Sequence, residues 1–450
     1  MRLSPWTIAR SPLQVQDLFF RQRQVDPLGV RIHTALAVVA CLLAAFPTTP
    51  LEWAALPLLA AFLIRMTEHH RVLRPLWLDP VVWLLAAWAA LIGLSFFYTH
   101  AAPRSWLGDA QSLRFAVLIL ALYPVLDRRR WLIAALLISF ALGQSIQLAH
   151  ALNLTSIQRL PGRISGWWDP VVGGSLLCAA LGMHLAGSLL STTRPARFLG
   201  TLGALAALLG ILATGSRGAW IAAVLTICIA ALIALLRLPS RQRAGPLLAG
   251  LALVSIAAAA VWLTPPVRAR LDQGIAETRA ALEDSRFTTD TGLRVAMALW
   301  AIAEFRAHPI LGVGAGGYQS WAAAQTSQRA RELDAPPRAR TMLHAHAHNW
   351  YLHTLATTGL LGASLLFSAL ILAIRSGLRG PRDGPPPSGY DAAPPLGLVG
   401  LAAAGLFDTI TINQQTAFLF FMLIALCLSI RPRALGEPTV HTPPAPGAPR

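Results

Sequence analysis

The sequence predicts an all-α polytopic membrane protein with about twelve transmembrane helices. Hydrophobic residues make up 55% of the 450 positions and charged residues only 13%, whereas a soluble domain carries roughly 25% charged residues. The mean hydropathy is +0.55. Runs of about 20 mostly apolar residues, the length that crosses a bilayer, recur along the chain. Together these observations exclude a water-soluble globular protein.

The candidate spans are twelve apolar runs, near residues 33–48, 50–65, 80–99, 111–126, 131–151, 170–192, 198–214, 217–236, 245–264, 348–374, 394–411 and 414–431. Two pairs of these runs are divided only by short breaks, Pro47–Pro50 and Gly215–Gly218. Because proline and glycine interrupt helices, we expect two spans in each pair.

Positively charged residues are distributed unevenly between the two sides of the predicted membrane. The formal net charge of +17 comes from arginine alone, since the 37 Lys+Arg positions contain no lysine. Most arginines flank apolar runs in alternate loops, and the positive-inside rule then places both termini in the cytoplasm. No small-residue cleavage site closely follows the first run, so we expect an uncleaved first span. This distribution indicates topology signals and contacts with membrane lipid rather than a nucleic-acid-binding face.

The expected organisation has four parts. Residues 1–264 contain the cytoplasmic N-terminus and spans one to nine, and residues 265–347 form a long periplasmic loop. Residues 348–431 contain the last three spans, and residues 432–450 form a disordered cytoplasmic tail. The long loop carries ten arginines and still falls outside, because long segments are translocated largely regardless of charge.

The long loop is expected to begin with two helices. The first is a charged amphipathic stretch, Val267–Asp284, and the second covers Leu293–Ala307. His308-Pro309 and the glycine-rich segment Gly312–Gly317 then end the second helix, because proline and repeated glycine stop helices.

Arg217 is a candidate site residue at the outer end of a span, within Ser216-Arg217-Gly218. An arginine there can reach the interface and offer its planar fork to a phosphate. The alternative is a simple interfacial anchor.

Arg294 is the second candidate. On a helix it shares one face with Met297, Ala298 and Ala301, so an arginine on this apolar stripe should have an anionic partner. The alternative to a ligand is an ion pair with a nearby acid such as Asp290 or Glu304.

Three histidines, His344, His346 and His348, alternate just before the span that follows the long loop. Histidine exchanges protons near neutral pH, and a base at the membrane surface suits a lipid-borne substrate. In an extended segment the three side chains share one side and could bind zinc. They could also be solvated loop residues. No external cysteine or HExxH pair supports a metal.

The sequence has no Walker loop, no GxGxxG after a strand, no DxD motif and no GxSxG elbow, which argues against cytoplasmic nucleotide chemistry. A lipid-linked donor that already carries a pyrophosphate leaving group needs no ATP outside the cell membrane. Two arginines would neutralise the departing pyrophosphate, and a histidine would deprotonate the acceptor hydroxyl.

The chain resembles the bacterial O-antigen ligases, in the superfamily that also includes O-antigen polymerases and protein O-oligosaccharyltransferases. Four motifs carry the resemblance along most of the chain: Ser216-Arg217-Gly218, Leu293-Arg294 through Trp300, Pro309-Ile-Leu-Gly-Val-Gly314, and His348-Asn349-xx-Leu352-xx-Leu355-xxx-Gly359-xx-Gly362.

The resemblance implies a GT-C-like membrane glycosyltransferase fold and a metal-independent reaction without a cofactor. O-antigen polysaccharide would move from undecaprenyl pyrophosphate to lipid A–core at the periplasmic face of the inner membrane. Arg217 and Arg294 would bind the donor pyrophosphate and His348 would activate the acceptor hydroxyl. His346 and Asn349 would support the site.

One departure concerns the acidic residue that often follows the His-Asn step in this superfamily. Thr357 or Thr358 occupies that place here, so no carboxylate receives a role there. Asp408, near the outer end of an expected span, is an intramembrane acid and a further candidate. Its alternative is a capped structural carboxylate.

Other functions remain open at this stage. A polymerase or a protein glycosyltransferase of the same superfamily would share the motifs. A polysaccharide or lipid transporter is the alternative from another class, because many transporters have twelve spans. Against it, the polar residues gather in one external loop rather than at the membrane midplane.

Overall fold

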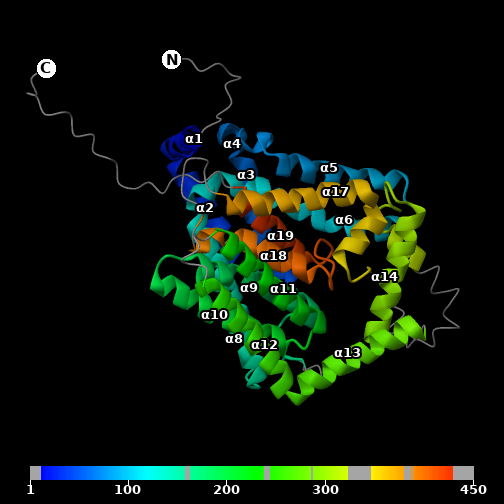
Figure 1. Cartoon of the computed structure of the whole chain (residues 1–450). Helices are drawn as coiled ribbons and strands as arrows, with labels where there is room; N and C mark the ends of the chain where they lie inside the picture. Colours follow the sequence, from blue (N-terminus) through cyan, green and yellow to red (C-terminus); the bar gives the residue numbers. More distant parts are fainter. Residues whose placement is uncertain are drawn as a thin grey trace, which may run out of the picture.

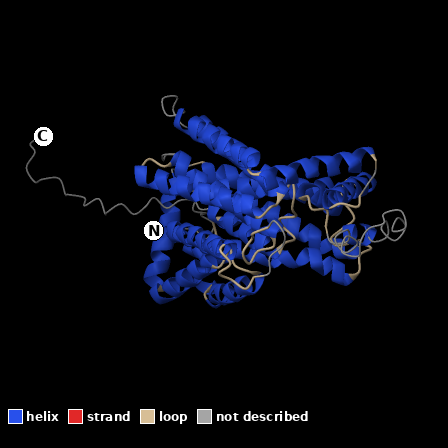
Figure 2. Ribbon diagram, turned by 90° about the horizontal axis from the view of Figure 1, so that it is seen from below, coloured by secondary structure: helices blue, strands red, loops and turns tan. Residues whose placement is uncertain are grey.

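The computed structural model describes residues 12–157, 163–237, 244–284, 287–322, 346–379, 387 and 389–428. These residues form helices and turns and contain no β-strand, as Figure 2 shows. Within them, six helices are long and apolar enough to cross a membrane, or seven if the bent pair at residues 17–42 is one span. The all-helical prediction is confirmed, and the count of twelve spans is not.

The α-helices are α1 (Pro12–Val25), α2 (Pro27–Leu42), α3 (Thr48–Ile64), α4 (Met66–Leu73), α5 (Pro80–Leu94), α6 (Pro103–Ala110), α7 (Val117–Leu122), α8 (Arg129–Ala151), α9 (Pro170–Leu190), α10 (Arg194–Ala213), α11 (Arg217–Arg237), α12 (Ala244–Leu263), α13 (Pro265–Glu283), α14 (Asp290–Ala307), α17 (Trp350–Leu378), α18 (Ala393–Ala404) and α19 (Gln414–Cys427). Short 3₁₀ helices are η1 (Leu76–Leu78), η2 (Ser95–Phe97), η3 (Gln111–Ala116), η4 (Tyr123–Arg128) and η6 (Gly389–Ala392).

Several predicted spans coincide with single helices. The runs at 170–192, 198–214, 217–236 and 348–374 are α9, α10, α11 and α17. The predicted break before Arg217 is also present, since Gly215 has a φ of 65°. Only glycine adopts this left-handed conformation without strain, so the chain turns there and α11 starts afresh.

Other predicted spans are shorter or broken. The run at 111–126 is divided into η3, α7 and η4. The run at 394–411 ends early, because α18 stops at Ala404 and residues 405–413 form turns. Asp408 therefore lies in a turn between α18 and α19 and not within a span, which corrects the sequence-based placement. Hydropathy did not detect this turn because four of its nine residues are the strongly apolar leucine, phenylalanine and isoleucine.

The helix α9 forms the centre of the core. It packs against α10, α11 and α18, and most of its side chains are buried. Small residues permit the closest approaches: a Cβ on Gly182 would collide with the carbonyl of Leu396, and one on Gly400 with the carbonyl of Cys178. Small residues at helix contacts are typical of membrane-protein packing.

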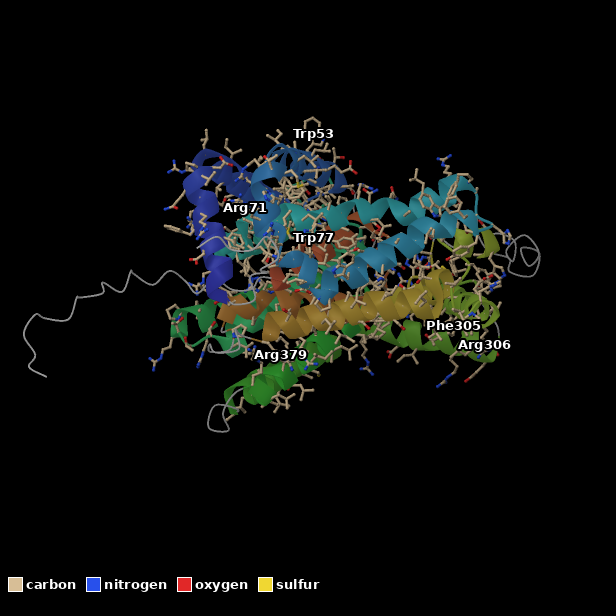
Figure 3. All side chains as sticks on the ribbon, turned by 90° about the horizontal axis from the view of Figure 1, so that it is seen from above. Trp53, Arg71, Trp77, Phe305, Arg306 and Arg379 are labelled. Carbon is tan, nitrogen blue, oxygen red and sulfur yellow. The ribbon has the colours of Figure 1, made fainter. Side chains whose placement is uncertain are left out.

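Figure 1 shows α5 and α17 side by side, with α1 and α4 near one end and α14 at the other. In Figure 3 Arg71 and Arg379 lie toward the first end, and Arg306 lies at the opposite end. The predicted tail at 432–450 lies outside the described residues.

Both helices predicted for the long loop are present. α13 begins two residues before the predicted Val267 and α14 begins three before Leu293. Thr289 caps α14, because its side-chain oxygen accepts a hydrogen bond of 3.0 Å from the amide of Gly292. An N-cap threonine of this kind fixes where the helix starts.

α17 is two helical segments that meet at Gly359, whose φ of 62° and ψ of −166° are not helical. The amides of Leu360 and Leu361 donate to the carbonyls of Pro309 and Ile310 at 2.8 and 3.1 Å. The segment predicted to end α14 is thus attached to α17 at the kink.

We expect Gly359→Ala to destabilise the protein by at least about 1–3 kcal/mol, because its φ/ψ region is essentially restricted to glycine. Its new Cβ would also collide with the carbonyl of Ile310. Gly93→Ala is the matched control, since a Cβ there meets nothing within 4 Å. Thermal unfolding in detergent measures both. Equal melting temperatures for the two variants would contradict the account of the kink.

Candidate functional site

Arg217 reaches from the start of α11 to the junction of α13 and α14. Its Nη2 donates to Thr291 Oγ1 at 2.8 Å and to Glu277 Oε2 at 3.1 Å, and its Nη1 donates to the carbonyl of Arg270 at 3.2 Å. Burial alone would raise the pKa of Glu277, but the hydrogen bond from Thr291 and the charge of Arg217 bring that pKa below its usual value. The guanidinium is therefore held in place against the first turn of α14.

Arg294 lies one turn further along α14 and has a different environment. Its Nη1 makes one long contact, 3.5 Å, to the carbonyl of Phe407. Among the described residues no carboxylate lies within 4.0 Å of its nitrogens. Burial lowers the pKa of Arg294, while Asp408 and Asp290 act in the opposite direction. Even partial burial of a cation without a paired carboxylate costs free energy, which favours an anionic ligand over a structural ion pair.

The ion pairs considered as alternatives for Arg294 are not formed. Neither Asp290 nor Glu304 pairs with it among the described residues, and Glu304 lines a separate cavity. Asp408 is held by three hydrogen bonds, from Ser175 Oγ at 3.1 Å, the amide of Thr409 at 2.8 Å and Asn413 Nδ2 at 2.7 Å. The structural reading of Asp408 is thus the better supported one.

His346 and His348 lie directly before α17, with ring centroids 4.2 Å apart. His346 is buried, and its Nδ1 lies 2.9 Å from Thr409 Oγ1. The amide of His348 donates to the same Nδ1 at 3.3 Å. Burial, aided by the nearby His353, lowers the pKa of His346 to about 3. His346 therefore stays neutral and accepts the hydrogen bond that orients the backbone of His348.

His348 is the more available of the two imidazoles. Its φ of 46° is unusual for a residue other than glycine, and such strain is concentrated at functional sites. Its Nδ1 is buried and has no hydrogen-bond partner among the described residues. Burial, followed by the proximity of His346 and Arg294, holds the pKa of His348 well below 6.5. The ring is therefore a neutral base at physiological pH.

Asn349 caps α17 instead of contacting the His348 ring. Its side-chain oxygen accepts from the amide of Leu352 at 2.9 Å, and its Nδ2 donates to the carbonyl of Leu406 at 3.0 Å. Asn349 therefore holds the backbone at the start of α17 against the turn that contains Leu406.

The turn between α18 and α19 brings the predicted residues together. Asn349 contacts Leu406, Arg294 contacts Phe407 and His346 contacts Thr409. Sequence reasoning did not find this turn, nor Arg163 and Arg270, whose charges act on the same cluster. The interruption of an apolar run by Gly405 and Asp408 was the signal that could have indicated it.

The zinc alternative requires His344, which lies outside the described residues. In the part of the chain that the structure does describe, no group of three or more His, Cys, Asp or Glu side chains could hold a metal ion.

Comparison with known protein families shows a similarity in the region of this site. Residues 202–367 match the family model described as O-antigen ligase. The similarity to O-antigen ligases covers this stretch, which is less than half of the chain. The matched stretch includes Arg217, Arg294, His346, His348 and Asn349. The family's members are membrane glycosyltransferase-like enzymes, and the search of curated proteins found no match.

The lowered pKa of His348 gives a testable pH profile for this domain. A group whose folded pKa is depressed stays neutral as the pH falls, so we expect kcat/KM for the donor, at saturating acceptor, to stay level from pH 8 to 6.5. An unperturbed histidine would be about half protonated at pH 6.5. The groups facing His348 are His346, Arg294 and His353. A loss of about half of the rate by pH 6.5 would contradict the expected neutral imidazole.

Proposed function

We propose that the protein is an O-antigen ligase that transfers O-antigen polysaccharide from undecaprenyl pyrophosphate to lipid A–core at the periplasmic face of the inner membrane. The observation that carries the proposal is Arg294, a partly buried guanidinium without a paired carboxylate among the described residues, beside the neutral imidazole of His348. An anion-binding group next to a base is the pair that this transfer needs.

The reaction can be written for these side chains. An acceptor hydroxyl oxygen attacks the anomeric carbon of the donor glycan and forms the new glycosidic bond. The bond from that carbon to the pyrophosphate oxygen breaks, and undecaprenyl pyrophosphate leaves with the electron pair. His348 takes the hydroxyl proton, while Arg294 and Arg217 bind the departing pyrophosphate. Arg217 is already oriented by Glu277 and Thr291, so it serves without rearrangement.

The proposal includes the finer topology. In this topology the protein has about twelve spans in a GT-C-like arrangement. Both termini are cytoplasmic, and the loop at 265–347 and the site are periplasmic. The positions of three arginines in Figure 3 support this topology. Arg71 and Arg379, which the positive-inside rule assigns to cytoplasmic loops, lie toward one end of the molecule. Arg306, from the loop proposed to be periplasmic, lies at the opposite end. Reporter fusions test this topology: a fusion after Arg379 should report a cytoplasmic location, and a fusion within α13 a periplasmic one.

Deletion of the gene tests the function. A ligase mutant lacks polymer on the lipopolysaccharide core but accumulates lipid-linked polymer, which gel analysis and lipid extraction detect. Single repeat units left on the core would indicate a polymerase instead. Unchanged lipopolysaccharide with loss of glycoprotein would indicate a protein glycosyltransferase.

Purified protein separates the ligase from a transporter. Transfer from a defined lipid-linked donor to lipid A–core in detergent, where no gradient exists, is the expected result. A transporter forms no product under these conditions.

A further inference from the structure

A cavity of about 340 Å³ lies at the far end of α14 from Arg217. Its walls come from the end of α14, the residues after η2 and the segment that follows α14. The residues that matter for its chemistry are Tyr98, His100, Glu304, His308, Ser320 and Trp321. Neither Arg294 nor His348 lines it. The volume is at the lower end of the roughly 300–1,000 Å³ typical of small-molecule sites.

Glu304 gives this cavity its polar character. Its side chain is only 3% exposed, and its Oε2 is buried without a hydrogen-bond partner among the described residues. Burial raises the pKa of Glu304 to about 7. A buried carboxyl oxygen without a partner costs free energy unless a ligand supplies a donor. Neutral hydroxyl groups suit it, because they provide donors without adding charge.

Aromatic rings supply the complementary surface. Tyr98 is fixed by a hydrogen bond of 3.3 Å from its hydroxyl to the carbonyl of Leu311. Trp321 packs edge to face on Trp300, with ring centroids 6.3 Å apart. Aromatic faces beside a carboxylate match a sugar ring, which presents C–H groups on one face and hydroxyls at its rim. The lining therefore fits a carbohydrate better than an apolar or phosphate ligand.

The surroundings indicate that this sugar is attached to a lipid. Large apolar side chains next to the cavity are exposed, with Phe97 at 83%, Ile310 at 69% and Leu360 at 53%. Phe97 directly precedes Tyr98, and Ile310 pairs with the kink of α17. In a membrane protein such side chains contact lipid, so the cavity lies beside the edge of the bilayer.

The cavity is separate from the pyrophosphate-binding arginines. Glu304 is ten residues beyond Arg294 on α14, which corresponds to about 15 Å along the helix. A ligand in this cavity therefore does not occupy the place of the donor pyrophosphate, and a saccharide of several rings could extend from it toward His348.

We propose that this cavity binds a sugar of the lipid-anchored acceptor, with Glu304 accepting its hydroxyl hydrogen bonds and Tyr98 and Trp321 packing on its ring. This inference rests on the proposed function and assigns an acceptor subsite to it.

Steady-state transfer with each substrate varied separately tests the subsite. For Glu304→Gln and Trp321→Ala we expect the KM for lipid A–core to rise about tenfold, which corresponds to about 1.4 kcal/mol. The KM for the donor and kcat at saturating acceptor stay near the wild-type values. Trp321→Phe keeps a ring and should recover most of the affinity. Glu283→Gln is the control, since Glu283 is an exposed carboxylate on α13 paired with Arg279 at 3.8 Å.

A binding measurement separates this inference from the proposed function. Core oligosaccharide freed of lipid A is titrated against the full chain in nanodiscs and followed by saturation-transfer NMR. Wild type and His348→Ala should bind, and Glu304→Gln should bind about tenfold more weakly. Equal binding by wild type and Glu304→Gln overturns the subsite, and so does a rise in donor KM instead of acceptor KM. Absence of transfer by wild type overturns the proposed function, while the titration still decides the subsite.

Discussion

His348→Ala is expected to lower the rate of glycan transfer by at least about 100-fold, the lower range for the loss of a general base. The imidazole is neutral because its pKa lies well below 6.5, and it stands beside Arg294. Without it the acceptor hydroxyl must lose its proton to water. Transfer from a lipid-linked donor to lipid A–core, measured at matched protein level in detergent, gives the rate.

Two controls accompany this variant. His70→Ala removes an exposed histidine of α4 and should transfer at the wild-type rate. Its membrane insertion and that of His348→Ala should both match the wild type. If His348→Ala retains wild-type activity, the histidine has no part in the mechanism. Inhibition of the wild type by a chelator, with recovery on adding zinc, would favour a metal at His344, His346 and His348 instead.

The parts of the fold governed by local rules were predictable from the sequence. α9, α11 and α17 are continuous apolar runs with clear breaks at their ends, and Thr289 and Pro309 delimit α14 as capping and helix-stopping residues do. The predicted site residues Arg217, Arg294 and His348 likewise lie within recognisable motifs. These features are determined by residues that are close in the sequence, so they can be predicted from one sequence alone.

The features that depend on distant residues were not predictable. Glu277 pairs with Arg217 across 60 positions, and the turn at 405–409 meets Arg294 across more than 100. Hydropathy treats residues 405–413 as apolar, although their carbonyls and Asp408 form polar contacts inside the protein. Tertiary hydrogen bonding therefore overrides the span that the composition indicates.

The two arginines consequently differ in how they are held. Arg217 has a carboxylate and a hydroxyl partner, which fix it before any ligand arrives. Arg294 has one long carbonyl contact and no paired carboxylate among the described residues. Loss of Arg217 leaves Glu277 without its cation, whereas loss of Arg294 removes a partly buried charge that has no carboxylate within 4.0 Å among the described residues. Replacing either arginine should therefore reduce transfer, but only the loss of Arg217 should clearly lower the stability of the protein.

Arg294→Ala is expected to lower the transfer rate by about 10²–10³-fold, the usual effect of removing one group that stabilises developing negative charge. Its melting temperature should stay near that of the wild type, because no carboxylate of the described residues lies within 4.0 Å of Arg294 and Asp408 keeps its three hydrogen bonds. Arg217→Ala should also nearly abolish transfer, but with a lower melting temperature. Arg294→Lys keeps the charge and loses the planar fork, so it should recover only part of the rate.

Arg279→Ala is the matched control for both arginines, since Arg279 is 71% exposed on α13 and pairs with the exposed Glu283 at 3.8 Å. It should change neither the transfer rate nor the melting temperature. Full activity of Arg294→Ala together with a lower melting temperature would make Arg294 a structural residue. In that case the pyrophosphate has to be bound elsewhere, and Arg163 and Arg270, whose charges reach the same cluster, become the next side chains to replace.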